Sequence, residues 1–236
     1  GLITMPALLL SGVPPHQSLG VNKVSACLGT TVALGNFARS NLVLWRVALA
    51  GIAFSLVGSW AGSRLALLLD AAVLGKVLVA LLPIGMCATL LPKKERKQDP
   101  LPHSGPRFWI PVAFVCLIMG GYDGFFGPGA GSFYALAFVT LAGFNLAKST
   151  AHAKLLNATS NVGGLLLFII GGKVIWATGF VMMAGQFLGA RAGSRLVLSK
   201  GQKLIRPMIV IVSAVMSAKL LYDSHGQEIL TWLGMH

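Results

Sequence analysis

The sequence predicts an all-α fold: a polytopic integral membrane bundle of helices, built from two homologous repeats and containing glycine-broken half-helices. Hydrophobic residues make up 55% of the 236 residues, charged residues only 11%, and the mean hydropathy is +0.77. A soluble domain carries about a quarter charged residues, because its surface faces water. Apolar stretches also recur along the chain, and the sequence overlays on itself at one constant offset.

Six apolar stretches approach or exceed the roughly 20 residues that cross about 30 Å of hydrocarbon. In chain order they are Val43–Leu69, Ala72–Leu91, Phe108–Tyr122, Ala147–Ile170, Val174–Leu198 and Pro207–Leu221. A further stretch, Gly131–Leu141, is too short for a comfortable span and is expected to be a half-helix after the glycine run GFFGPGAG. Hydrocarbon tolerates a broken helix only where protein or water covers the freed backbone groups. We therefore expect this segment to line a substrate path.

The two repeats emerge when the sequence is shifted by 131 residues. Lys23 then falls on Lys154, Trp45 on Trp176, and the tetrapeptide Ala61-Gly62-Ser63-Arg64 on Ala192-Gly193-Ser194-Arg195. Chance similarity between apolar helices would match Leu and Val, not Lys and Trp. Internal repeats are typical of secondary transporters, whose binding site lies at the repeat interface. The predicted organisation is a first repeat (1–92), a basic linker (93–107) and a second repeat (108–236).

The basic loops predict the orientation of the repeats. Lys and Arg concentrate on the cytoplasmic side of membrane proteins, which places residues 93–107 in the cytoplasm. Basic loops alternate between the two copies, so the repeats are expected to be inverted, with five crossings in the second. The second copy has a helix and the glycine run ahead of Ser132, which overlays on Gly1. The first repeat is therefore expected to lack its N-terminal helix.

A polar stripe in the second repeat is the main candidate binding site. Thr150, Lys154, Asn157 and Asn161 follow one another at steps of four, three and four, which places them on one helix face. A lone lysine near a helix end usually extends to the membrane interface, which would explain Lys148. Lys154 lies further in and shares its face with two amides. The first repeat has a thinner counterpart: Lys23 and Thr30 persist, but Leu19 and Ala26 replace the other polar members. Asn22, next to Lys23, is a further candidate for the site.

The sign of the charges in the spans favours an anionic substrate. Bases there include Lys23 and Lys154, whereas the acids reduce to Asp123, with Asp70 at a helix junction. Free backbone N–H groups at the glycine break also attract anions, because a helix N-terminus carries partial positive charge. The candidate backbone donors are Gly127, Gly129 and Gly131. Arg64 and Arg195 are better explained as interfacial anchors.

Asp123 and His152 are the candidates for proton coupling, each with a structural alternative. Asp123 precedes the glycine break and could either cap the broken helix or carry a proton, because burial raises a carboxyl pKa and a nearby lysine lowers it. His152 lies beside the polar stripe in sequence but points off its face. Helix packing explains it better than a proton relay.

Other function classes fit less well. The 19 basic residues are spread through loops and apolar helices without aromatic interleaving, unlike a nucleic-acid patch. Cys27, Cys87 and Cys116 have no CxxC spacing, so neither a metal site nor a cofactor is expected. An intramembrane protease would need either a second intramembrane aspartate or a GxSG-type serine with a histidine base, and the sequence offers neither. An anion-selective channel stays open as an alternative to a carrier. The expected partners are a small anion and the lipid bilayer, with a homo-oligomer left open.

Three segments carry a resemblance to a known family. They are YDGFFGPGAGSFYALAFVTLAGFNLAKSTAHAKLLNATSNVGGLLLF (122–168), VIWATGFVMMAGQFLGARAGSRL (174–196) and GVNKVSACLG (20–29). With them the chain resembles the sulfite exporter TauE/SafE (TSUP) family, close to its YfcA-type members, over essentially its whole length. The resemblance implies a transporter that moves sulfur-containing or organic anions across the bacterial inner membrane, with export as the expected direction. The family's first glycine-rich element would fall directly before Gly1.

Overall fold

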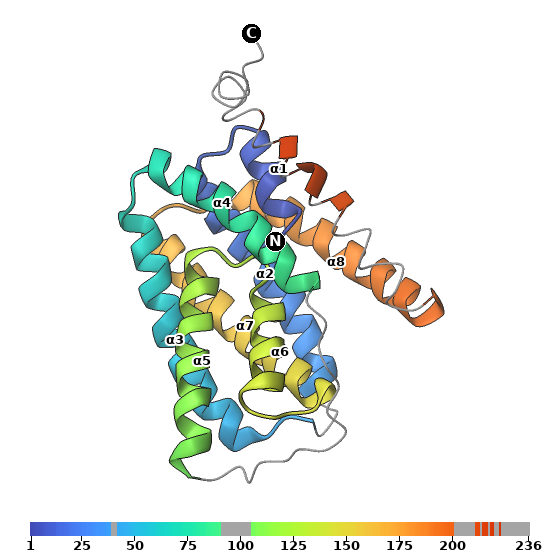
Figure 1. Ribbon diagram of the computed structural model, residues 1–236. Helices are drawn as coiled ribbons and strands as arrows, with labels where there is room; N and C mark the ends of the chain where they lie inside the picture. The colour runs from blue at the N-terminus through green and yellow to red at the C-terminus, as the bar shows by residue number, and fades with distance from the viewer. Residues whose placement is uncertain are drawn as a thin grey trace, which may run out of the picture.

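The computed structural model describes residues 1–38, 42–90 and 105–200, and then 211, 212, 214–216, 218, 219 and 222. The side chains of 32–38, 90 and 190–200 are outside the description. The described chain is all-helical, as predicted, and contains no strand (Figure 1). Its helices are α1 (Thr4–Leu10), α2 (Pro15–Ala38), α3 (Trp45–Leu68), α4 (Ala71–Leu90), α5 (Pro106–Phe125), α6 (Ala130–Thr140), α7 (Leu146–Ile170) and α8 (Trp176–Lys200).

Four of the described helices are long and apolar enough to cross a membrane: α3, α4, α5 and α7. The short apolar helix α6 follows the glycine run, where the sequence predicted a half-helix. The predicted span Val174–Leu198 forms α8 (Trp176–Lys200), whose side chains are described only up to residue 189. The predicted span Pro207–Leu221 lies largely outside the described residues. Residues 93–104 of the predicted linker also lie outside them.

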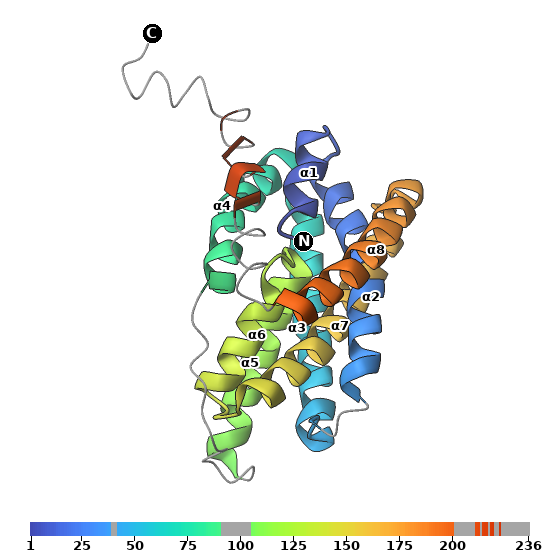
Figure 2. The same ribbon diagram turned by 90° about the vertical axis from the view of Figure 1, so that its right-hand side faces the viewer.

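The helices pack around α7. This helix contacts α2, α3, α5 and α6, while α2 also packs against α8. Figure 1 shows α3 and α5 side by side, and Figure 2 shows α2 beside α8. Two apolar cores fill the bundle, one around Phe138, Phe144 and Leu156, the other around Leu78 and Phe168. Together they leave the polar centre of α7 between them.

Helices α3 and α5 touch backbone to backbone. A Cβ atom at Gly62 would overlap the carbonyl oxygen of Gly121, and one at Gly120 would lie 2.5 Å from the carbonyl oxygen of Ser55. A Cβ at Gly58 would likewise overlap the carbonyl oxygen of Leu117, and one at Gly124 would overlap that of Ser59. Small residues allow this approach between membrane helices. The close contact fixes the C-terminal end of α5 relative to α3.

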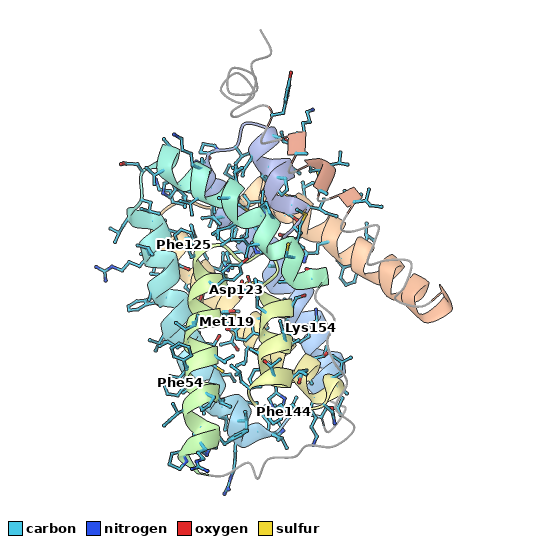
Figure 3. The ribbon with its side chains drawn as sticks, in the orientation of Figure 1. Phe54, Met119, Asp123, Phe125, Phe144 and Lys154 are labelled. Atoms are coloured by element: carbon cyan, nitrogen blue, oxygen red, sulfur yellow. The ribbon has the colours of Figure 1, made fainter. Side chains whose placement is uncertain are left out.

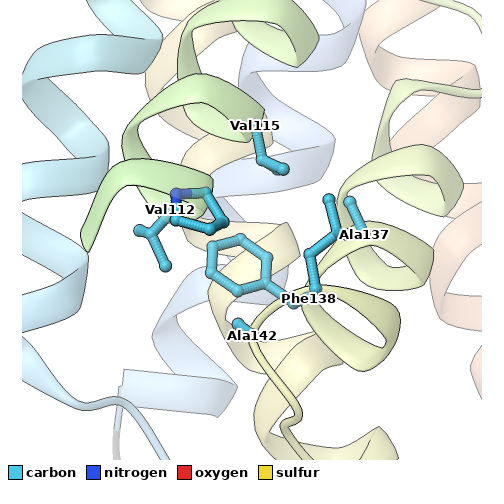
Figure 4. A pocket seen from close by; sticks show the side chains of 7 residues that line it. Val112, Val115, Ala137, Phe138 and Ala142 are labelled. Carbon is cyan, nitrogen blue, oxygen red and sulfur yellow. The ribbon is translucent and has the colours of Figure 1, made fainter. Parts of the chain in front are cut away.

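A shallow apolar hollow lies between α5 and α6. Figure 4 shows it beside the Phe138 ring, with Val112 and Val115 on the α5 side and Ala137 and Ala142 on the other. Its lining contains no polar side chain. It is a packing feature of the first core and offers nothing to bind an anion.

The helices of the two repeats begin at positions that are separated by the same 131 residues as the sequence copies. α2 begins at Pro15 and α3 at Trp45, which are 131 residues before Leu146 of α7 (146 − 15) and Trp176 of α8 (176 − 45). Paired helices therefore begin at paired positions. The inverted orientation of the copies stays a prediction.

Candidate functional site

A fully buried ion pair joins α2 to α5. Lys23 is 0% exposed and Asp123 is 1% exposed, and Lys23 Nζ lies 3.2 Å from Asp123 Oδ1. Lys23 Nζ also donates to the backbone oxygen of Asp123. A buried charge costs several kcal/mol unless it is paired and hydrogen-bonded, and here each charge compensates the other. The pair ties the middle of α2 to the last turn of α5.

Helix α7 completes this network from the other side. Ser160 Oγ donates to Asp123 Oδ2, and Lys23 Nζ donates to Asn161 Oδ1 over 3.3 Å. The Asn161 amide nitrogen donates to Asn157, to its backbone oxygen over 2.7 Å and to Oδ1 over 2.8 Å. Both oxygens of the Asp123 carboxylate thus accept a hydrogen bond within the bundle. The Lys23 ammonium donates three, to the carboxylate and backbone oxygens of Asp123 and to Asn161.

The glycine break lies directly beside the ion pair. Gly127 and Gly129 have φ angles of 97° and 84°, a left-handed conformation that other residues rarely adopt. The Tyr122 hydroxyl donates to the carbonyl oxygen of Pro128 over 2.8 Å. A Cβ at Gly85 of α4 would lie 2.7 Å from the same oxygen. The carbonyl group of Pro128 is therefore covered by protein, as the freed backbone groups of a broken membrane helix require.

A cavity of about 790 Å³ opens beside the start of α6. Its polar lining includes Lys154, Thr150 and Gln186, and it contains no acidic residue among those described. Lys154 Nζ has no hydrogen-bond or ion-pair partner in the described part of the chain. The N–H of Gly131 donates no hydrogen bond to a described residue either. The full lining is Gly1, Leu2, Ile3, Thr4, Thr89, Gly129, Gly131, Ser132, Ala135, Thr150, Ala153, Lys154, Met182, Gly185, Gln186 and Gly189.

The structure divides the predicted site into two neighbouring regions. Lys154 and Thr150 line the cavity together with Gly129 and Gly131. The ion-pair region holds the remaining predicted residues Asn22, Lys23, Asp123, Gly127 and Asn161. Asn157 connects them: it accepts from Asn161, and its Nδ2 would lie 3.1 Å from a Cβ at Gly131. Figure 3 labels Asp123 and Lys154, one from each region.

His152 lies in a third place, away from both regions. Its Nε2 accepts the N–H of Leu44 over 3.1 Å, and its Nδ1 donates to the carbonyl oxygen of Lys148 over 2.8 Å. The ring packs against Phe144, with ring centres 5.0 Å apart. Both ring nitrogens therefore bond to backbone groups, which favours the packing explanation over a proton relay. For Asp123 the capping alternative does not hold, because its carboxylate binds side chains and α6 has no side-chain cap.

Sequence reasoning missed the serines that surround the ion pair. Ser160 lies one position before Asn161 and therefore off the polar stripe, so the helical period does not select it. On α3, Ser63 Oγ donates to the carbonyl oxygen of Gly124 over 2.9 Å, and Ser59 Oγ donates to that of Ser160. Ser55 bonds the hydroxyl of Tyr134 over 2.6 Å. The signal was present, because these three serines recur at steps of four along one face of α3.

Comparison with known proteins agrees with this architecture. The family profile described as "Sulfite exporter TauE/SafE" matches residues 1–220. The chain is 61% identical over 237 residues to "Probable membrane transporter protein YfcA" of Escherichia coli (strain K12), covering 100% of this chain and 87% of that protein. It is 44% identical over 227 residues to a "Probable membrane transporter protein" of Haemophilus influenzae, covering 94% of this chain and 87% of the relative.

A protein of Sinorhizobium sp, "Probable membrane transporter protein ORF9", is 42% identical over 237 residues, covering 99% of this chain and 88% of the relative. No solved structure matches the chain significantly. The profile covers nearly the whole sequence, the relatives are named as transporters, and the described helices suit a multi-pass membrane protein. The chain belongs to the sulfite exporter TauE/SafE family of membrane transporters.

Proposed function

We propose that this transporter moves a small anion, and that the ammonium of Lys154 is its principal ligand. The proposal rests on a lysine that has no partner among the described residues and lines a cavity whose described lining holds no carboxylate. A cation path would need carboxylates or several converging oxygens at this place. The N–H of Gly131, at the start of α6, donates to no described residue and adds a second anion donor.

The buried ion pair supports the assignment to Lys154. Lys23 has its charge compensated by Asp123 at 3.2 Å, so it adds little net attraction for an anion. Lys154 lines the cavity and has no countercharge among the described residues. Thr150, Asn157 and Gly129 are proposed to complete the substrate site. Asn22, Lys23, Asn161 and Gly127 are proposed to hold the adjacent glycine break in position.

The substrate is proposed to be a sulfur-containing oxyanion or an organic sulfonate or carboxylate. The family description names a sulfite exporter, which favours a small oxyanion, export as the direction and the bacterial inner membrane as the location. A lysine presents a compact point charge, which suits a small oxyanion better than a planar bidentate clamp would. The support for sulfite in particular comes from the family description, and no feature of the cavity selects sulfite over other small oxyanions.

Asp123 is proposed as the carboxylate that couples transport to protons. A proton on Asp123 would remove the charge that compensates Lys23, and would thereby weaken the contact between α2 and α5. His152 is a weaker candidate because its two ring nitrogens are committed to backbone groups. The coupling would be seen as anion flux that depends on the proton gradient.

The test is a binding panel followed by a flux measurement on the purified protein. Sulfite, sulfate, thiosulfate, sulfoacetate and small carboxylates are titrated by calorimetry, and we expect at least one to bind saturably. The bound anion is then loaded into proteoliposomes. Flux that saturates and responds to a pH gradient supports a carrier, linear flux indicates a channel, and binding of cations in place of anions would refute the proposal.

A further inference from the structure

The ammonium of Lys23 is surrounded by oxygen atoms of three kinds. It donates to a backbone carbonyl and a carboxylate of the same residue, Asp123, and to the amide oxygen of Asn161. The two side-chain oxygens lie 3.2 and 3.3 Å from the nitrogen. The lysine comes from α2, whereas its acceptors come from α5 and α7. Carboxylate, amide and carbonyl oxygens are also the ligands that hard metal cations take in proteins.

The electrostatic setting is that of a cation site. The last carbonyl groups of a helix have no partner within it and carry partial negative charge. In α5, which ends at Phe125, the carbonyl of Asp123 accepts from Lys23 and that of Gly124 accepts from Ser63 over 2.9 Å. The carboxylate of Asp123 adds a full negative charge at the same point. In broken transporter helices, such ends coordinate Na⁺ or protons.

Asn22 provides a second, independent observation. Its Oδ1 is buried and has no hydrogen-bond partner among the described residues. Its amide faces the ion pair: a Cβ at Gly127 would lie 3.4 Å from Asn22 Nδ2, 3.4 Å from Lys23 Nζ and 3.2 Å from Asp123 Oδ1. A rotation of the amide exchanges its oxygen and nitrogen. Asn22 can therefore offer one further oxygen to an ion at this place.

We propose that Lys23 is a tethered cation: its ammonium fills a site that these oxygens would otherwise offer to a monovalent metal ion such as Na⁺. The native chain then binds no Na⁺ between α2, α5 and α7, and its transport cycle does not require Na⁺ at this place. Removal of the ammonium creates a Na⁺ site made of Asp123, Asn161 and Asn22. This inference does not depend on which anion is carried.

Thermal unfolding of the purified protein in detergent tests the proposal. The wild type and Lys23→Ala are compared in NaCl, KCl and choline chloride at equal ionic strength, without substrate. The wild-type midpoint should be the same in the three salts. Lys23→Ala should unfold at a lower temperature in choline chloride and recover in NaCl. The recovery should be about 5–10 °C when NaCl exceeds its dissociation constant about a hundredfold.

Two variants serve as controls. Lys23→Met fills the space with an uncharged side chain, so its loss of stability should be the same in all salts. Lys23→Ala combined with Asp123→Ala removes the carboxylate and should lose the response to Na⁺. The proposal is overturned if Na⁺ stabilises the wild type over choline, or if Lys23→Ala does not respond to the identity of the salt. Failure of Lys23→Ala to fold when prepared in NaCl also counts against it, because Na⁺ should replace the ammonium.

Discussion

Substitution of Lys154 by alanine should weaken anion binding by about ten- to hundredfold. Lys154 lines the cavity and has no partner in the described part of the chain, so its ammonium is available to a ligand. A hydrogen bond to a charged group contributes about 1.5–3 kcal/mol, and each 1.4 kcal/mol changes the affinity about tenfold. The measurement is a calorimetric titration with the tightest anion of the panel.

Stability should separate this effect from misfolding. Lys154→Ala breaks no hydrogen bond or ion pair between described residues, so we expect the unfolding midpoint to stay within a few degrees of the wild type. Lys154→Arg should restore only part of the affinity, because the larger planar guanidinium replaces a compact ammonium in a confined site. Lys148→Ala, on the first turn of the same helix, is the matched control and should bind normally.

One result would refute the reasoning about Lys154. If Lys154→Ala folds and binds the anion as tightly as the wild type, the ammonium is not a ligand. The remaining donors at the cavity are the side chains of Thr150 and Gln186 and backbone N–H groups such as that of Gly131. The anion would then have to be held by these groups, and substitutions of Thr150, Gln186 and the glycine break would be the next to examine.

Three further predictions concern stability and topology. Asp123→Asn should destabilise the protein by about 3–5 kcal/mol, because it leaves the ammonium of Lys23 buried without a countercharge; denaturant or thermal unfolding measures this. Gly62→Val should lower the stability by about 1–3 kcal/mol or abolish folding, because its side chain would overlap the backbone of α5. Cysteines placed at Gln98 and Ser224 in a cysteine-free background should be labelled from opposite sides of the membrane, since the basic loops predict an inverted repeat.

Each of these predictions has its own control. Replacing both members of the ion pair by apolar residues should cost less than Asp123→Asn alone, because no charge is then left unpaired. Gly185→Ala should not destabilise the protein, because a Cβ there meets no atom within 4 Å. Labelling of both cysteines from one side would contradict the inverted orientation and leave the duplication unaffected.

The sequence could predict the helices from α3 onward and the face of α7 that carries the candidate site, whereas α1 and α2 were not among the predicted apolar stretches. Apolar runs predict the described second-half helices, α5 to α8, to within three residues; for example, Phe108–Tyr122 is the prediction for α5, which spans Pro106–Phe125. The helical period also placed Lys154 and Asn161 on one face. These are local properties, decided by residues close together along the chain.

The division of the site into two regions could not be predicted. Lys23 and Asp123 are 100 residues apart, and whether they meet depends on how α2 and α5 both pack against α7. Nothing in the local sequence indicates that Asp123 pairs with Lys23, while Lys154 has no partner among the described residues. Ser160 could not be predicted for a related reason: its carboxylate partner, Asp123, comes from α5, and only the packed bundle brings the two together.

The glycine contact between α3 and α5 has a mechanical consequence. Where backbones touch, no side chain is present that could change its rotamer to absorb a relative shift. We therefore expect α3 and α5 to move as one rigid body during transport. The boundary of that body against α2 and α7 is made of side chains that can reorient, among them Lys23 and Ser160. Motion that changes access to the cavity should be concentrated at this boundary.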